Sequence, residues 1–219
     1  MAIDTKNMRP QVFNWGPCVV GVDIPMWICD KLVEEGRKSD YDGSEFLAGH
    51  IKNQHQFSPE TQKWIWPEFL PVFKMYRAIH CQYHRIPNLP VTFEPDSLWI
   101  NFQKANEFNP HHIHIGDLSF VLYCKIPKEM EEEQKNFKGT AMFPGEISWE
   151  FTQQARPRWA TTGMSHFPRE GEMFIFPAML QHWVAPFKTP DVERISVSGN
   201  MSCKFHPTKE QPTVTTNYF

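Results

Sequence analysis

The chain has 219 residues, of which 41% are hydrophobic and 21% are charged, and its formal net charge is -3. This composition excludes a disordered chain, and the length suits one domain. The mild acidity, without a basic stripe, makes nucleic acid and anionic membranes unexpected partners. Five cysteines without a Cys-x-x-Cys motif argue against a disulfide framework or a zinc knuckle. With no apolar signal core at the start and no run of about 18 apolar residues, we expect a cytoplasmic protein.

Residues 1–90 carry mainly helical signals, after a short extended start at 12–22. The first predicted helix begins near Ile24 and Pro25, because proline is favoured in the first turn of a helix. Apolar residues then recur at helical spacing until Gly36, which marks the predicted end. We interpret this half as helices that pack on a sheet through an apolar face.

A second helix is predicted to begin at Ser58. Serine accepts hydrogen bonds from the first turn, and the following Pro59 fits the first helical position. Pro67 and Pro71 are expected to break or restart this helix, because an internal proline removes a backbone donor. The predicted apolar face of the helix consists of Phe69, Val72, Phe73, Tyr76, Ile79 and Tyr83.

From about residue 91 the pattern changes to short strands separated by turn signals. The candidate strands are 97–103, 111–115, 117–126, 140–150, 172–177, 180–186 and 193–203. Short strands in series are typical of a sandwich or barrel. The acidic run 129–133 suggests a solvated loop or short helix. We therefore predict a single domain over 1–219, mainly β with flanking helices. Its parts are a mostly helical buttress (1–90), a β core (91–206) and a Thr- and Pro-rich tail (207–219).

A histidine motif lies in the predicted strand 111–115, where His112 and His114 are two residues apart. Because side chains alternate along a strand, these two point to one face, while His111 and Ile113 point to the other. Two imidazoles on one face can bind one metal ion, and imidazole suits Fe, Zn, Cu and Ni. Taken alone, the motif fits a surface or hydrogen-bonded histidine pair equally well.

A third histidine and an arginine follow in the last predicted strands. His182 opens strand 180–186 after an apolar strand and a proline turn. Arg194 and Ser196 share one face of strand 193–203, which is otherwise apolar. A buried arginine is costly unless it pairs with an anion, and its planar fork suits a carboxylate. The competing interpretation is a salt bridge from Arg194 to Asp191 or Glu193.

Together these motifs resemble the Fe(II)/2-oxoglutarate-dependent oxygenase superfamily, in particular a set of small oxygenases of which many are phage-encoded. The resemblance covers residues 99–200, nearly half of the chain, and is less distinctive in the helical half. It implies a double-stranded β-helix, a jelly-roll and cupin-like core, with helices buttressing one sheet. The shared patterns are Trp-x-Asn (99–101), Asn-Pro-x-His-x-His (109–114), Leu-Ser-x-Val (118–121), Phe-Pro-x-x-Leu-x-His-x-Val-x-Pro (176–186) and Glu-Arg-Ile-Ser (193–196).

The resemblance also implies a ligand set for the cofactor Fe(II). His112 would be the first ligand and His182 the distal one. The superfamily's usual set is two histidines and one carboxylate, but the carboxylate position here holds His114. A three-histidine site would carry one negative charge fewer. Asp117 is the alternative third ligand, in which case His114 would lie behind the metal site.

For the cosubstrate 2-oxoglutarate, the resemblance implies that Arg194 and Ser196 hold the carboxylate far from the metal. Tyr123 falls where related enzymes place a tyrosine that helps to bind this carboxylate. Asn101 and Gln103 share a face of the preceding strand and are expected to line the same pocket.

The resemblance implies an oxidoreductase, a Fe(II)- and 2-oxoglutarate-dependent dioxygenase that hydroxylates an unidentified substrate. Two alternatives stay open: a cupin-type metalloenzyme that does not use 2-oxoglutarate, and a non-catalytic β-helix binding protein. Against the cupin alternative, a Glu is expected four residues after His114, but position 118 is Leu. The expected partners are dioxygen and a small-molecule or peptide substrate, and neither nucleic acid nor a membrane is expected. A homodimer is one assembly that the sequence allows.

Overall fold

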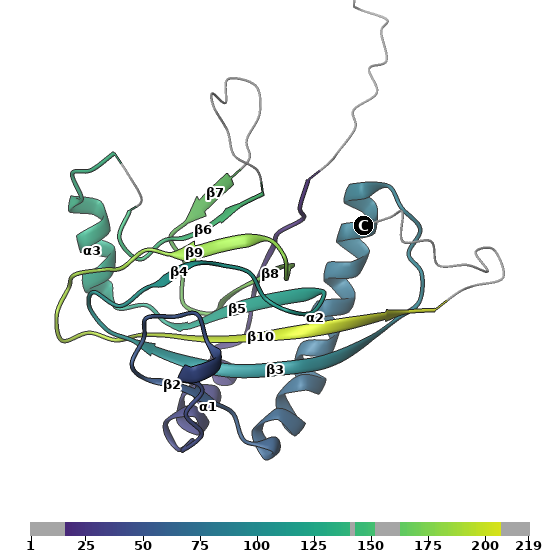
Figure 1. Ribbon diagram of the computed structural model, residues 1–219, viewed down its shortest axis with the longest axis horizontal. Helices are drawn as coiled ribbons and strands as arrows, with labels where there is room; N and C mark the ends of the chain where they lie inside the picture. Colours follow the sequence, from purple (N-terminus) through teal and green to yellow (C-terminus); the bar gives the residue numbers. More distant parts are fainter. Residues whose placement is uncertain (1–15, 141–142, 152–162, 207–219) are drawn as a thin grey trace, which may run out of the picture.

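Two antiparallel β-sheets form the centre of the molecule (Figure 1). The computed structural model describes residues 16–140, 143–151 and 163–206. The larger sheet has six strands in the order β1 (Val20–Asp23), β8 (Glu172–Pro177), β5 (Leu118–Lys125), β10 (Arg194–Phe205), β3 (Val91–Gln103) and β2 (Gln54–Gln56). The smaller sheet has four, in the order β4 (Asn109–His112), β9 (Gln181–Val184), β6 (Ile147–Glu150) and β7 (Gly163–His166).

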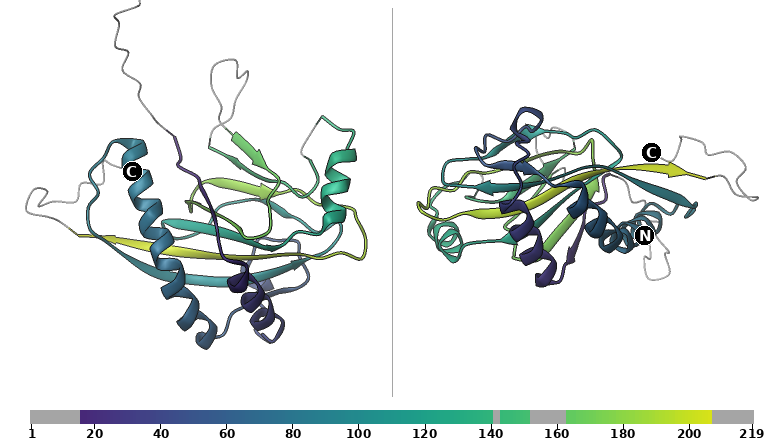
Figure 2. Two further views of the ribbon diagram at one scale, coloured as in Figure 1. Left: turned by 180° about the vertical axis from the view of Figure 1, so that it is seen from behind. Right: turned by 90° about the horizontal axis from the view of Figure 1, so that it is seen from below.

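Two helices, α1 (Met26–Arg37) and α2 (Pro59–His84), lie against the outer face of the larger sheet (Figure 2). A one-turn helix, η1 (Ser44–Phe46), lies between them in the chain. The Oγ of Ser58 accepts a hydrogen bond of 3.1 Å from the backbone N–H of Thr61, which confirms the predicted cap of α2. Among the described residues, no helix is long and apolar enough to cross a membrane.

The expected break of α2 at its prolines is wrong, because the helix runs unbroken through Pro67 and Pro71. An internal proline costs a helix about 3 kcal/mol. Burial of one large apolar side chain returns about 1.5–3 kcal/mol, and α2 buries several against the sheet. Tertiary packing therefore outweighs the local preference. The predicted apolar face is only partly buried, since Ile79 and Tyr83 remain exposed.

Several strand boundaries also differ from the prediction. β4 ends at His112, so strand 111–115 is wrong in its extent, and strand 140–150 is reduced to β6. β7 was not predicted. The first 90 residues also supply both edge strands of the larger sheet, β1 and β2. The acidic run lies in a short helix, α3 (Lys128–Asn136). The predicted tail lies outside the described residues.

Alternation along the central strands divides the interior into two apolar clusters. On β5, Leu118, Phe120 and Leu122 belong to the cluster beneath the helices. Val121 and Tyr123 belong to the cluster between the two sheets, because neighbouring strand residues point to opposite faces. The same alternation brings the polar residues of β3, β5 and β10 into the space between the sheets.

Phe120 provides a test of the helix–sheet packing. Its ring is 1% exposed and packs edge-on against three rings of α2, those of Trp66, Phe69 and Phe73. We expect Phe120→Ala to lower the free energy of unfolding by about 3–5 kcal/mol, because a large cavity remains. Urea denaturation measures this change. The matched control Phe143→Ala, at a ring that is 40% exposed, should change the stability by only about 0.5 kcal/mol.

Candidate metal centre

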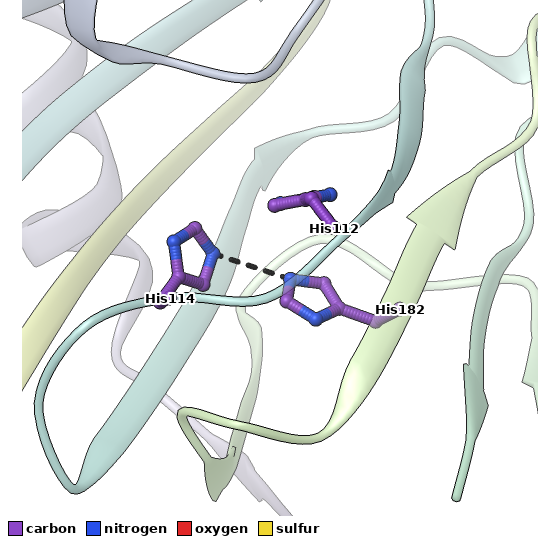
Figure 3. Close-up of side chains that lie close together, drawn as sticks. All are labelled: His112, His114 and His182. Carbon is purple, nitrogen blue, oxygen red and sulfur yellow. Dashed lines mark hydrogen bonds between the residues drawn. The ribbon is translucent and has the colours of Figure 1, made fainter. Parts of the chain in front are cut away.

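Three histidines meet in the space between the sheets (Figure 3). His112, at the end of β4, is the register partner of His182 on β9, so the strand pairing itself places their rings together. His114 lies two residues beyond β4, and its Nε2 atom is 3.2 Å from the Nε2 atom of His182. The three ligand nitrogens lie within 4.8 Å of one another. Nitrogens that bind one ion at about 2.1 Å lie at most about 4.2 Å apart, so a small inward shift completes the set.

Backbone carbonyls fix the orientation of two of these rings. The Nδ1 of His112 lies 2.7 Å from the carbonyl oxygen of Pro110, and the Nδ1 of His182 lies 2.8 Å from that of Leu180. Because a carbonyl oxygen only accepts hydrogen bonds, Nδ1 carries the proton in both rings. Each Nε2 therefore presents a lone pair, as in histidines that bind metals.

Burial keeps these imidazoles neutral at physiological pH. Burial and, to a smaller extent, the neighbouring imidazoles lower the pKa of His182 to about 3 and that of His114 to about 4. The pKa of His112 is lowered by the same burial. Neutral imidazole is the form that coordinates a metal ion, so the chemistry of the donor set fits a divalent cation.

Asp117 lies outside this cluster. Its Oδ2 accepts a hydrogen bond of 2.6 Å from the backbone N–H of Cys203, on β10. The turn that separates Asp117 from the histidines contains Gly116 with a φ of 100°, a conformation that glycine adopts without a steric penalty. In the described part of the chain, the metal-competent group thus contains His114 and not Asp117.

The histidines and Arg194 line one cavity of about 40 Å³. Arg194 opens β10 and is 1% exposed. Its Nη1 donates a 3.0 Å hydrogen bond to the carbonyl oxygen of Gly145, its Nη2 donates to Oε1 of Gln103, and its Nε has no partner among the described residues. Within those residues no carboxylate lies within 4.0 Å of the guanidinium. Glu193 pairs instead with Arg37, so the local salt bridge is not formed.

Strand register places three further polar residues beside Arg194. Ser196 pairs with Asn101 on β3 and with Tyr123 on β5, and all three line the cavity. The Oη of Tyr123 and the Oδ1 of Asn101 are buried and have no hydrogen-bond partner among the described residues. The Tyr123 hydroxyl is an unused donor beside an unneutralised guanidinium, and these two groups fit a bound carboxylate, because buried polar groups need partners. The Oδ1 of Asn101 only accepts hydrogen bonds, so it does not bind that carboxylate.

Gln103 lies behind the cavity and does not line it. Its side chain accepts from Arg194 and donates a 2.5 Å hydrogen bond to the carbonyl oxygen of Glu107, so it orients the guanidinium. Sequence reasoning missed the carbonyl of Gly145, since a backbone acceptor leaves no side-chain signal. The only signal there was the Pro144-Gly145 turn.

The fold and the site define a protein of two packed antiparallel sheets, with three histidines between them that could hold a metal ion. Residues 97–200 match the family described as "Putative 2OG-Fe(II) oxygenase", and the matched region contains the three histidines and Arg194. The match spans nearly half of the chain, and it is to the 2OG-Fe(II) oxygenases. The family implies Fe(II) and 2-oxoglutarate as the cofactors, and dioxygen and an organic substrate as the partners.

Solved structures of such enzymes share the fold. A prolyl-4-hydroxylase from Pseudomonas putida is 15% identical, with 84% of this chain and 91% of that chain covered and a TM-score of 0.51. A Trichoplax adhaerens prolyl hydroxylase, solved with a hypoxia inducible factor peptide fragment, is 9% identical, with 85% and 83% covered and a TM-score of 0.52.

A 2OG-Fe(II) oxygenase family protein from Burkholderia pseudomallei is 13% identical, with 84% of each chain covered and a TM-score of 0.51. At these identities the likenesses show the fold alone, and they confirm the predicted double-stranded β-helix with flanking helices. No curated protein sequence matches this chain significantly.

Proposed function

We propose that the chain is a hydroxylase in which His112, His114 and His182 hold Fe(II), while Arg194 and Ser196 hold the distal carboxylate of 2-oxoglutarate. One observation carries the proposal. The fully buried guanidinium of Arg194 has no carboxylate partner among the described residues, and it lines the same cavity as the three histidines. A buried cation is costly when it is unpaired, so the cavity favours an anionic ligand.

Bound Fe(II) would supply the redox chemistry that converts 2-oxoglutarate and dioxygen to succinate and carbon dioxide while a substrate C–H bond becomes C–OH. The chain's own residues position the reactants. The carbonyls of Pro110 and Leu180 hold two imidazoles with their Nε2 lone pairs toward the shared centre. The buried walls of the cavity limit the access of bulk water to it.

The guanidinium of Arg194 is oriented by neutral acceptors, the side chain of Gln103 and the carbonyl of Gly145. Neither acceptor neutralises its charge, so the full charge remains for a carboxylate. The hydroxyl groups of Ser196 and Tyr123 can donate further hydrogen bonds to that carboxylate, since Tyr123 Oη has no other partner in the described region.

The proposal is tested by anaerobic titration of the Fe(II)-loaded protein with 2-oxoglutarate. Chelation of the metal by the cosubstrate should give the weak visible charge-transfer band that is general in this superfamily. Calorimetry on the same samples measures the affinity. If iron binds but neither the band nor heat of binding appears, the cupin-type alternative replaces the proposal. If no metal binds tightly, the alternative of a non-catalytic binding protein replaces the proposal.

The third ligand is tested by a matched pair of variants. His114→Ala should weaken Fe(II) binding by more than about 100-fold, since changes in the outer shell of metal sites already cost about 10–100-fold. Asp117→Asn should leave the metal affinity unchanged, because its carboxylate bonds to the backbone of Cys203. Equilibrium dialysis with metal analysis measures both. The reverse pattern would make Asp117 the ligand.

A further inference from the structure

A second and larger cavity, of about 770 Å³, lies on the helix side of the larger sheet. Its walls are the last turns of α2, the start of β3, the end of β10 and the turn before β5. Leu118 lines this cavity, whereas the next residue, Ser119, lines the metal cavity, because adjacent strand residues point to opposite faces. The two cavities are therefore separate. A volume of this size lies within the range of about 300–1,000 Å³ that is usual for ligand pockets.

Arg77 is the cation of this cavity, and only 7% of the residue is exposed. Its Nη2 donates a 3.2 Å hydrogen bond to the carbonyl oxygen of Pro87, and its Nη1 lies 3.3 Å from Nδ1 of His80. Its Nε is buried without a partner in the described residues. Across those residues no carboxylate approaches the guanidinium within 4.0 Å. The guanidinium lies over the ring of Phe205, with Cζ 4.9 Å from the ring centroid, but among the described residues this buried charge lacks a counter-ion. Such an arrangement is costly.

The other titratable residues of the cavity wall do not supply that counter-ion. Asp117 accepts a hydrogen bond from the backbone of Cys203 and makes no ion pair with Arg77. Burial lowers the pKa of His80 to about 4, and it also lowers that of His84, so both imidazoles are neutral at pH 7. The guanidinium is then the only positive charge among the lining residues. Much of the remaining wall is apolar, with contributions from Ile86, Val91, Phe93, Leu118, Met179 and Phe205.

We propose that this cavity binds a small molecule with an apolar body and one carboxylate, whose charge pairs with Arg77. The apolar body would pack between α2 and the ends of β3 and β10. A carboxylate suits the site better than a phosphate, because two of the guanidinium nitrogens already have partners. A phosphate carries about -1.5 to -2 charges and three strong acceptor oxygens, so it needs more donors. The site requires neither iron nor 2-oxoglutarate.

The test is calorimetric titration of the full chain with decanoate at neutral pH. We expect one decanoate per chain and at least about tenfold weaker binding of uncharged decanol, which cannot pair with Arg77. Arg77→Gln should weaken decanoate binding at least about tenfold. Lys74→Gln, which removes an exposed cation from the same helix, should leave it unchanged. No binding of decanoate by the wild-type chain, or equal binding of decanol, overturns the proposal.

A second variant keeps Arg77 in place, in case its removal disturbs the fold. His80→Glu puts a carboxylate beside the guanidinium and should reduce decanoate binding at least about tenfold. Arg194→Ala locates the ligand, because it should leave decanoate binding intact. Decanoate affinity equal to wild type in folded Arg77→Gln and His80→Glu, or its loss in Arg194→Ala, would contradict a site at Arg77.

Discussion

Arg194→Ala should strongly weaken 2-oxoglutarate binding while the metal stays bound. Truncating one partner of a buried, hydrogen-bonded charge pair costs about 2–5 kcal/mol. At about 1.4 kcal/mol per tenfold, the Kd for 2-oxoglutarate should rise by roughly 30- to 4,000-fold. The effect is large because Arg194 is 1% exposed and, among the described residues, no other cation lines the cavity at neutral pH. Anaerobic calorimetry with the Fe(II)-loaded protein measures the Kd.

Two variants separate lost recognition from general damage. Arg37→Ala removes a half-exposed arginine that pairs with Glu193 at the entrance to β10, and it should leave the Kd unchanged. Arg194→Lys keeps the charge but loses the planar fork, so its Kd should fall between those of wild type and Arg194→Ala. If Arg194→Ala keeps its circular dichroism spectrum, its metal and wild-type affinity for 2-oxoglutarate, then Arg194 does not hold the cosubstrate.

His182→Ala should abolish stable metal binding. Changes in the outer shell of a metal site already cost about 10–100-fold in affinity, so loss of a ligand should cost more than about 100-fold. The variant should also lose the metal-dependent rise in Tm, because a ligand that binds only the folded state stabilises it. Metal content after dialysis and thermal unfolding with and without Fe(II) measure the two effects.

The matched control for this variant is His111→Ala. His111 is adjacent to His112, but its ring stacks on Trp183 with centroids 3.9 Å apart and lies outside the histidine cluster. Its removal should leave the metal content unchanged. Equal metal loss in both variants would indicate damage to β4 and β9, whereas full retention in His182→Ala would remove that residue from the ligand set.

Local signals predicted much of the fold. Ser58 and Pro59 marked the start of α2 because a helix cap involves neighbours in the chain. The short apolar run that ends at Pro177 forms β8, as its composition and its flanking turn residues predicted. The prediction failed where distant packing decided the outcome. α2 continues through Pro67 because its side chains are buried against the sheet, and no local pattern reports that burial.

Residue types and their spacing were enough to predict the candidate site: a His-x-His motif, a later lone histidine, and an arginine two residues before a serine in an apolar strand. How these groups meet depends on the folded chain. Sheet register pairs His112 with His182. Burial within the closed sheets leaves Arg194 without a carboxylate partner among the residues that the structure describes. Register joins segments that are far apart in the chain, so it follows from the packing of whole sheets rather than from the residues beside each site.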